Sequence, residues 1–367
     1  MSFHVARKTV LFVFTLALLL PGSAIAQKYN RTDLTADMSS VSANTANLNV
    51  DPNLVNAWGL ARANTSPWWV ADNGTGLSTL YNATGVPQSL VVKILTPDGK
   101  GTSPATGAVF NPTTAFPVAP NVKSIFLFVT EDGTIAGWNP GVNPNAVVVK
   151  NRSGKAIYKG CAIAVGKSGP KFYATNFQSG RVEIFDANFN KLHLYDGAFR
   201  LPGLSDKYAP FNIQNVGGNL VVTFAHREPG STDEDHGPGL GFAGVFTRGG
   251  RLLLRLEHGS WFNAPWGVAL APSDFGMFSH HLLIGNFGDG TLNAFNLFTG
   301  KHEGTLLDDT SGQALTIDGL WAISFGGDQT NNGLATSLYF TAGPNDEKNG
   351  LFGNITAIAA EQPGNSE

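Results

Sequence analysis

Residues 282–301 read LLIGNFGDGTLNAFNLFTGK, and this stretch decides the fold. Its two flanks, LLIGN and TLNAFNL, are short and rich in apolar and β-favouring residues, and the Gly/Asp run between them is typical of a β-hairpin turn. The same order of strand, polar turn with glycine, strand and second turn recurs along the chain. Three close copies and two looser ones are PWWVADNGTGLSTLYNATG (67–85), IFLFVTEDGTIAGWNPG (125–141), KFYATNFQSGRVEIFDANF (171–189), NLVVTFAHRE with GFAGVFTRGG (219–250) and SLYFTAGPNDEKNGLFGNIT (337–356).

A short apolar strand precedes each hairpin and has a recurring pattern of its own. The six strands are NAWGLA, ATGAVF, KGCAIA, APFNIQ, APWGVA and DGLWAI, and their alignment places at one equivalent position Trp58, Gly107, Cys161, Phe211, Trp266 and Trp321. These residues lie 49, 54, 50, 55 and 55 positions apart, about 53 on average. Six units of four short antiparallel strands predict an all-β fold, a six-bladed β-propeller. A two-sheet sandwich could use the same strands but would not require six equal units.

The N-terminus has the organisation of a secretory signal peptide. Arg7 and Lys8 precede the apolar run TVLFVFTLALLL, and Ala24-Ile25-Ala26 fits a cleavage site before residue 27. The alternative is a retained membrane anchor, but the apolar run is short for a bilayer span. We therefore expect a signal peptide at residues 1–26.

The rest of the chain divides into three parts. We expect a latch segment at 27–50, a single propeller domain at 51–360 and a disordered tail at 361–367. Within the latch, residues 29–37 are expected to add an outer strand to the last blade, beside residues 354–360.

Composition restricts the partners. Without residues 1–26 the chain has 341 residues, with 22 Lys and Arg against 27 Asp and Glu. This acidic balance argues against nucleic acid or an anionic membrane surface, because both need a basic face. The one cysteine, Cys161, has small and apolar neighbours, so we expect a buried thiol and no intramolecular disulfide. We expect a secreted, periplasmic or extracellular monomer with no membrane span after signal cleavage.

Longer motifs add a resemblance to a known family. DPNLVNAWGL, APFNIQNVGGNL, TIDGLWAISFG and LYFTAGPNDEKNGLFG resemble an uncharacterised family of exported bacterial propeller proteins, some of which end in a PEP-type sorting signal. The resemblance covers nearly all of residues 29–358 and implies a propeller fold and export, but no agreed reaction. This chain has no C-terminal sorting helix, so we expect a released protein, and it has Ala57 where the family usually has proline.

One face of the predicted propeller gathers polar side chains. The strands of a blade run from the axis to the rim, so the loops before the inner strands and the turns between second and third strands lie on the same face. The turns bring to this face Asp72, Asn73, Glu131, Asp132, Asn176, His226, Glu228, Asn286, Asp289, Asn345, Asp346 and Glu347. Asn56, Lys159, Asn212 and Asp318 lie at or before the starts of inner strands, so we expect them nearer the axis.

These residue types predict a binding site. Calcium prefers carboxylate and amide oxygens, so Asn56, Asn212 and Asp318 are candidate ligands of Ca²⁺ or another divalent cation. Lys159 could instead attract an anionic ligand. The predicted ligand-binding residues are Asn56, Lys159, Asn176, Asn212, His226, Glu228, Asn286 and Asp318.

A structural role is the alternative for each turn residue, because tight turns require Asn, Asp and Gly for their backbone conformation. Asp289 of NFGDG is expected to be a turn residue, whereas Asn286, at the inner end of its strand, is the better ligand candidate. Trp58, Phe211 and Trp266 share one repeat position with Trp321, which favours packing between blades over stacking on a ligand.

The fourth blade carries an insertion. Residues 226–241 (HREPGSTDEDHGPGLG) replace a tight turn with about a dozen extra residues. They form either a lid or metal-binding arm over the channel, or a solvated acidic loop. Their spacing matches no standard zinc or EF-hand pattern.

No catalytic motif accompanies these residues, since the sequence lacks GxSxG, HExxH, CxxCH, a phosphate-binding glycine loop and a Rossmann fingerprint. We therefore expect a secreted propeller that binds a small molecule, a glycan or a protein through its acidic face. The alternative is a hydrolase, lactonase or lyase assisted by a divalent metal at the axis, because Asp318, Asn212 and Asn56 resemble the ligands of calcium-dependent lactonase and lyase propellers. This chain departs from those enzymes in having no carboxylate before the first inner strand. A structural matrix protein is a third hypothesis.

Overall fold

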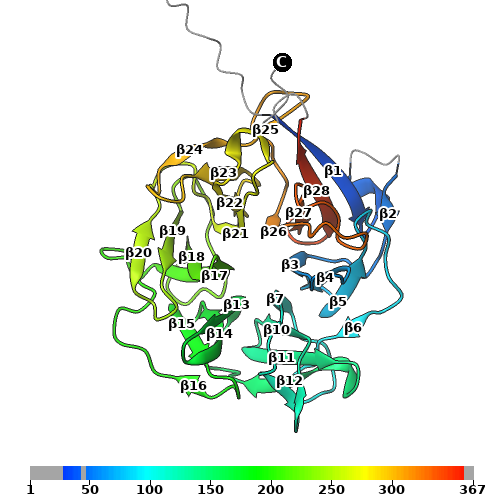
Figure 1. Cartoon of the computed structure of the whole chain (residues 1–367), viewed down its shortest axis with the longest axis vertical. Coiled ribbons are helices and arrows are strands. Elements are labelled where there is room, and N and C mark those ends of the chain that lie inside the picture. Colours follow the sequence, from blue (N-terminus) through cyan, green and yellow to red (C-terminus); the bar gives the residue numbers. More distant parts are fainter. Residues whose placement is uncertain (1–27, 43–46, 359–367) are drawn as a thin grey trace, which may run out of the picture.

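The structure is a computed structural model, and it describes residues 28–42 and 47–358. Six β-sheets surround a central axis, as Figure 1 shows. The six-bladed β-propeller predicted from the repeats is therefore confirmed. The predicted signal peptide and the predicted C-terminal tail lie outside the described residues.

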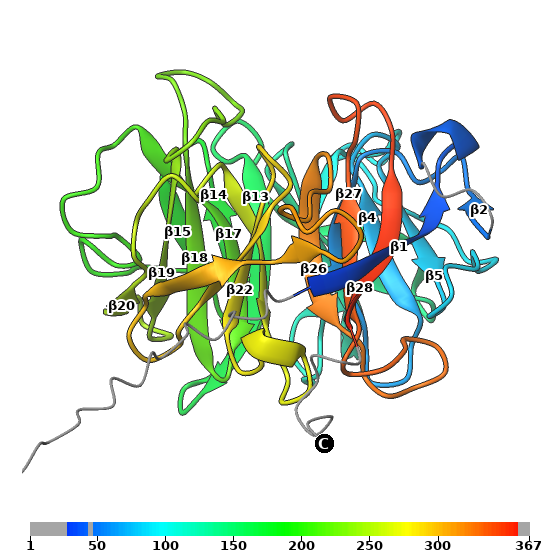
Figure 2. The same cartoon turned by 90° about the horizontal axis from the view of Figure 1, so that it is seen from above.

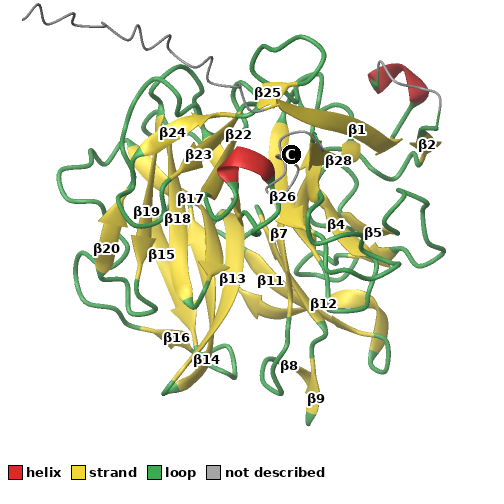
Figure 3. Ribbon diagram, turned by 45° about the horizontal axis from the view of Figure 1, so that its top comes forward, coloured by secondary structure: helices red, strands yellow, loops and turns green. Residues whose placement is uncertain are grey.

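Each of the first five blades is a four-stranded antiparallel sheet, and its strands follow one another from the axis to the rim. The first blade contains β3 (Ala57–Ala61), β4 (Trp68–Asp72), β5 (Leu77–Tyr81) and β6 (Val92–Lys93). The second contains β7 (Ala105–Phe110), β10 (Phe126–Thr130), β11 (Thr134–Asn139) and β12 (Asn143–Asn151), and a separate hairpin of β8 (Pro117–Ala119) and β9 (Val122–Lys123) extends from it (Figure 3).

The next three blades repeat this order. The third contains β13 (Tyr158–Gly166), β14 (Gly169–Asn176), β15 (Arg181–Phe185) and β16 (Lys191–Leu192). The fourth contains β17 (Tyr208–Val216), β18 (Asn219–His226), β19 (Gly241–Phe246) and β20 (Leu252–Arg255). The fifth contains β21 (Pro265–Leu270), β22 (Leu282–Asn286), β23 (Leu292–Phe295) and β24 (His302–Thr305).

The sixth blade joins the two ends of the chain. It contains β26 (Leu320–Phe325), β27 (Leu338–Ala342), β28 (Leu351–Ala357) and β1 (Lys28–Ala36), with the short β2 (Asn49–Val50) and β25 (Leu307–Asp308) paired parallel to β1. β1 runs antiparallel to β28, with Tyr29 opposite Ala357, in the place expected for the latch (Figure 2). Tyr29 is fully buried and donates its hydroxyl hydrogen to the Phe275 carbonyl at 3.1 Å, which anchors β1 to the fifth blade.

The turns that define the repeat have the predicted chemistry. Gly76, Gly133, Gly180 and Gly290 end the turns between second and third strands in four blades, and all have positive φ, between 64° and 77°. Glycine adopts this left-handed conformation without a steric penalty, which explains its recurrence at one turn position.

The inner strands of neighbouring blades pack closely around the axis. A Cβ atom on Gly59 would lie 2.4 Å from the carbonyl oxygen of Thr106, so this contact between the first two blades requires glycine. The described residues include two single-turn 3₁₀ helices, η1 (Ser39–Val41) and η2 (Gly276–Phe278). Within residues 28–42 and 47–358, no helix has the length and apolar character needed to span a membrane.

The repeated aromatic residues of the inner strands meet around the axis. The rings of Trp58 and Trp321 stack with centroids 3.6 Å apart, and that of Trp266 lies 6.4 Å from Trp58 and 6.1 Å from Trp321. Trp321 of the sixth blade thus packs on Trp58 and Trp266 of its two neighbouring blades, as expected for packing between blades, and Trp58 also meets Trp266 across the axis. A cavity of about 20 Å³ lined in part by Gly107, Cys161 and other inner-strand residues remains. Cys161 is a buried free thiol, and burial raises its pKa.

Candidate functional site

The loops before the inner strands and the turns between second and third strands lie on one side, which we call the top face. In the first blade the backbone N–H of Asn73 donates to the backbone carbonyl of Asn56 at 3.0 Å. The equivalent bonds join Gly288 to Asn263 in the fifth blade and Gly343 to Gly319 in the sixth. The face inferred from strand order therefore exists, and its loops are hydrogen-bonded to its turns.

A buried lysine lies near the centre of this face. Lys159, in β13, has a side chain that is 1% exposed, and its Nζ atom is 2.6 Å from Glu131 Oε1 and 3.0 Å from Asp233 Oδ1. Glu234 Oε2 is 3.9 Å from the same ammonium group. The rings of Trp58 and Phe177 face it at 5.0 Å and 5.8 Å, within cation–π distance. Carboxylates from the second and fourth blades and two aromatic rings thus surround the ammonium group of Lys159.

The carboxyl groups around Lys159 outnumber its single positive charge. Glu347 also interacts electrostatically with Lys159, and its side chain is hydrogen-bonded to Asn56. We call Lys159, Glu131, Asp233, Glu234 and Glu347 the Lys159 cluster.

The pKa values of the cluster follow from burial and charge. Burial alone would lower the pKa of Lys159, but Glu131, Glu234 and Asp233 outweigh it and raise that pKa. Burial raises the pKa of Glu234 to about 7 despite the opposing effect of Lys159, and burial likewise raises the pKa of Glu347. The Glu234 side chain is 6% exposed, and its Oε2 atom has no hydrogen-bond partner among the described residues.

Asn56 connects the cluster to the axis. Its Oδ1 atom accepts the Trp321 indole N–H at 2.8 Å, and its Nδ2 atom donates to Asn73 Oδ1 at 3.3 Å. Asn73 in turn donates to Glu131 Oε2 at 2.9 Å. A continuous chain of hydrogen bonds therefore runs from the aromatic layer to the carboxylate nearest Lys159.

The turn that carries Glu347 has an unusual backbone. Asn345, Asp346 and Glu347 have φ values of 57°, 54° and 62°, so three consecutive non-glycine residues are left-handed. Such conformations cost free energy and are enriched at functional sites. The Asp318 carboxylate, which is exposed, stabilises this turn by accepting the Asn345 N–H at 2.9 Å.

The three predicted metal ligands each have structural hydrogen bonds. Asn212 is buried, donates to the Trp266 carbonyl at 2.8 Å and accepts the Ile213 N–H at 2.8 Å. The amide oxygen of Asn56 is used by Trp321, and Asp318 caps the turn described above. Their side chains bind neighbouring protein groups in this structure.

Asn176 and Asn286 join their turns to the loops that precede the inner strands of their blades. Asn176 is buried and donates to the Lys155 carbonyl at 3.0 Å, while its oxygen accepts two backbone N–H groups. Asn286 is also buried and donates to the Trp261 carbonyl at 2.8 Å. Its Oδ1 atom has no hydrogen-bond partner among the described residues.

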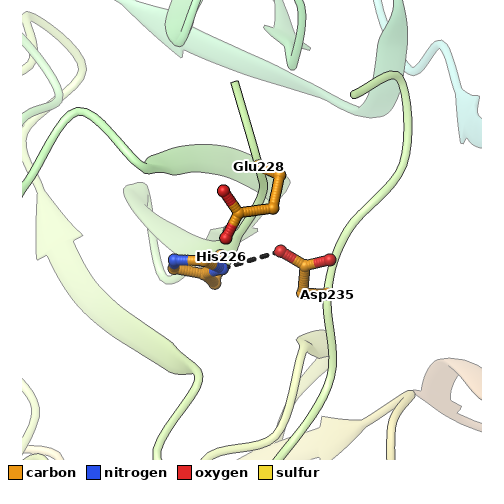
Figure 4. A group of neighbouring side chains, drawn as sticks. All are labelled: His226, Glu228 and Asp235. Carbon is orange, nitrogen blue, oxygen red and sulfur yellow. Dashed lines mark hydrogen bonds and ion pairs between the residues drawn. The ribbon is translucent and has the colours of Figure 1, made fainter. Parts of the chain in front are cut away.

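The insertion in the fourth blade brings together three polar side chains that are separate from the Lys159 cluster. His226 ends β18, Glu228 follows two residues later, and Asp235 returns beside them from the far end of the loop (Figure 4). One ligand atom from each lies within 4.8 Å of the others, and His226 Nδ1 is 2.8 Å from Asp235 Oδ2. We call these residues the loop triad. His226 and Glu228 are among the predicted ligand-binding residues, and Asp235 is not, because only the path of the loop brings Asp235 back.

Two depressions border these groups. One has a volume of about 650 Å³ and is lined by Glu131, Asp132, Ile157 and Gln178, among others. The other, of about 470 Å³, shares Ile157 and Gln178 with it and extends to Glu228 in the loop of the fourth blade. Of the Lys159 cluster, Glu131 is the residue that lines the first depression.

The acidic partners of Lys159 were not among the predicted site residues. The position of Glu131 in its turn predicts the correct face, and the insertion that contains Asp233 and Glu234 is acidic. What the sequence does not contain is the direction in which a long loop folds. The signal in the sequence was Lys159 itself. A lysine at the start of a buried inner strand needs a carboxylate partner, so its position indicates that acidic side chains lie nearby.

No protein-family model matches the chain. Uncharacterized protein L690 of Acanthamoeba polyphaga mimivirus is 31% identical over 327 residues, which cover 83% of this chain and 81% of L690. Uncharacterized protein R648 of the same virus is 30% identical over 318 residues, or 83% of this chain and 76% of R648. Uncharacterized protein R640 is 32% identical over 257 residues, but the matched region is 47% of its length, so this chain spans about half of that relative.

Solved structures resemble the chain in fold. A protein of unknown function from Bacteroides thetaiotaomicron has a TM-score of 0.53 at 10% identity, over 90% of this chain and 76% of that one. A streptogramin B lyase has a TM-score of 0.50 at 11% identity, over 90% of this chain and 98% of that one. At these identities the similarity shows the propeller fold alone. The relatives by sequence are viral, so membership of an exported bacterial family stays an expectation, and the chain belongs to the family of the uncharacterized mimivirus proteins L690 and R648.

Proposed function

We propose that the protein binds a small ligand with a cationic group at the top face, over the Lys159 cluster. The observation that carries this proposal is the imbalance of charge: one ammonium group faces four carboxyl groups, and Glu234 has a buried oxygen without a hydrogen-bond partner. Buried carboxylates without a counter-charge are costly, so a second cation there would be stabilised.

The surroundings of the cluster support the same class of ligand. Glu131 of the cluster lines a depression of about 650 Å³, and a second depression of about 470 Å³ adjoins the first. Both volumes fall in the range of about 300–1,000 Å³ that is usual for small-molecule sites. Lys159 is already surrounded by carboxylates, which disfavours the anionic ligand considered from the sequence. The left-handed turn that carries Glu347 is a further indication that this region is maintained for binding.

We also propose, on the sequence alone, that the protein acts after export as a secreted, periplasmic or extracellular monomer. Detection of chain that starts at Gln27 outside the cytoplasm would support export. Full-length chain retained in the cytoplasm of the native host would contradict it.

The binding proposal is tested by calorimetric titration with putrescine, with the neutral diol of the same length as control ligand. We expect putrescine to bind and the diol not to bind. Glu347→Gln should weaken putrescine binding about tenfold, because a tenfold change equals about 1.4 kcal/mol, the size of one charge-assisted hydrogen bond.

Asp346→Asn is the matched control variant. It removes the same charge from the neighbouring residue, whose side chain is 94% exposed, and should leave putrescine affinity unchanged. Equal binding of the diol and the diamine, or equal losses in the two variants, would contradict a site over the cluster.

Enzyme activity is the second candidate. Glu234 supports it, because a buried carboxyl group with a pKa of about 7 near Lys159 is suited to general acid–base catalysis. The streptogramin B lyase shows that a related fold can accommodate lyase chemistry. The structural hydrogen bonds of Asn56 and Asn212 weigh against the axial divalent metal expected for a metal-assisted hydrolase, lactonase or lyase. Turnover of lactone or ester substrates that disappears in Glu234→Gln would favour this candidate over simple binding.

A further inference from the structure

We propose that the loop triad, His226, Glu228 and Asp235, is a binding site for a divalent transition metal of the zinc class. One imidazole nitrogen and two carboxylate oxygens lie within 4.8 Å of one another. Figure 4 shows the three groups turned toward a common centre. This inference does not depend on the proposed ligand over the Lys159 cluster.

The backbone holds His226 and Asp235 next to each other before any metal binds. The Asp235 N–H donates to the His226 carbonyl at 2.8 Å, and these residues form an isolated β-bridge. The Tyr208 ring lies edge-on to the His226 ring, with centroids 5.1 Å apart, and limits the orientation of the imidazole. His226 and Asp235 are therefore held together whether or not a metal is bound.

The third ligand can complete the site. The Glu228 side chain is 59% exposed, so it can turn toward a metal without unpacking the core. In a tetrahedral zinc site with bonds of about 2.0–2.1 Å, neighbouring ligand atoms lie about 3.4 Å apart, so closure requires movements of about 1 Å. Lys207, at 3.4 Å from Glu228, is itself 52% exposed and can withdraw into solvent.

The donor set favours zinc over calcium. Calcium prefers six to eight oxygen ligands, whereas zinc accepts one imidazole and two carboxylates and leaves its fourth position for water. A metal on His226 Nδ1 would replace the hydrogen bond to Asp235, and the neutral ring would then carry its single proton on Nε2. The partly exposed carboxylates leave room for that water.

The site would hold both ends of the fourth-blade loop. Glu228 lies at its beginning and Asp235 near its end, and Asp233 and Glu234, which contact Lys159, immediately precede Asp235. A metal bound to the loop triad would therefore fix the segment that covers the Lys159 cluster. Metal binding and the shape of the top face are expected to be coupled through this loop.

The experiment is a titration of the purified, chelator-treated protein with ZnCl₂, followed by calorimetry and by protease sensitivity of the loop. We expect one zinc ion per chain and slower cleavage within residues 227–240 when zinc is present. His226→Gln should weaken zinc binding by at least about 100-fold, since loss of even an outer-shell partner of a ligand costs about 10- to 100-fold.

His236→Gln is the matched control, because it removes an exposed histidine of the same loop that is not part of the triad. It should retain wild-type zinc affinity. A wild-type protein that binds no stoichiometric zinc, or equal losses of affinity in the two variants, would overturn the proposal. Titration of the wild type decides the question even if His226→Gln fails to fold.

Discussion

Lys159 and the carboxyl groups around it determine the charge at the centre of the top face. A lysine with 1% exposure must be neutral or paired, and here Glu131 and Asp233 pair with it at 2.6 Å and 3.0 Å. Asn73 holds the second oxygen of Glu131, so the geometry of the ion pair is fixed from a neighbouring turn. The charge at the centre of this face is thus built in by side chains from different blades.

Replacing this lysine should destabilise the fold. Lys159→Met keeps most of the side-chain volume but leaves Glu131 and Glu234 without their cation, and we expect a loss of about 2–4 kcal/mol in the free energy of unfolding. The measurement is urea unfolding at neutral pH. Lys207→Met, which breaks an exposed ion pair with Glu228, should cost less than about 1 kcal/mol. Equal stability of Lys159→Met and the wild type would mean that the ion pairs do not matter.

A second buried carboxylate predicts a pH dependence of stability. Burial alone would raise the pKa of Glu183, but its bonds with Lys191, Tyr158 and Arg152 outweigh burial and hold the pKa below its usual value. The unfolded-state pKa of a glutamate is about 4.3. The stabilisation is therefore complete above that pH and is lost as the pH falls through the lower folded-state pKa.

Glu183→Gln isolates this contribution. At about pH 7 it should lower the free energy of unfolding by about 1–3 kcal/mol, because it removes charge-assisted hydrogen bonds. The difference from the wild type should disappear in strongly acidic buffer, where both side chains are uncharged. A difference that stays constant between neutral and acidic pH would contradict the assigned role of this carboxylate.

Among the strands, β1 has a special position, because it belongs to the sixth blade in space and to the start of the chain in sequence. Eight of its nine residues are buried or partly buried. Its backbone is paired with β28 and with the short β2 and β25. The ring is closed by this strand without a disulfide, since the chain has one cysteine.

Tyr29→Ala should weaken the closure. It removes a fully buried ring that lies 4.8 Å from the ring of Phe275, together with its hydroxyl bond. Truncation of a buried aromatic residue costs about 3–5 kcal/mol, so thermal unfolding should occur at a markedly lower temperature. Asn30→Ala, on the exposed side of the same strand, should change stability by about 0.5 kcal/mol or less. Similar unfolding of the two variants would show that β1 does not clamp the ring.

The strands were predictable from the sequence for a physical reason. Each blade repeats the same strand-and-turn pattern, so Trp58, Trp266 and Trp321 could be aligned without any coordinates, and the inner strands were found where expected. The candidate site was predictable only in part. Lys159 was identified and placed near the axis, but Glu234 and Asp235 reach their partners through a loop that has no counterpart in the other blades.

The molecule as a ring has a closed centre. Stacked tryptophans and the buried Lys159 side chain fill the axis near the top face, and a cavity lined by residues of all six inner strands has a volume of about 20 Å³. A ligand of useful size therefore has to bind on the face and beside the loop of the fourth blade. This arrangement explains why turn and loop residues supply the carboxylates of both proposed sites, while the inner strands supply Lys159 and packing.

The pairing of β1 with β28 also determines when the ring can be completed. β1 is synthesised before the strands of the first five blades and β28 after them, so the contact of Tyr29 with Ala357 spans nearly all of the described residues. Closing such a long loop carries a large entropy cost and is slow. A nascent chain would therefore carry an incomplete ring until β28 emerges. After that, and until its own β1 has docked, β28 of one copy could accept β1 of another, so the strand that closes the monomer would also be the route to a strand-exchanged dimer.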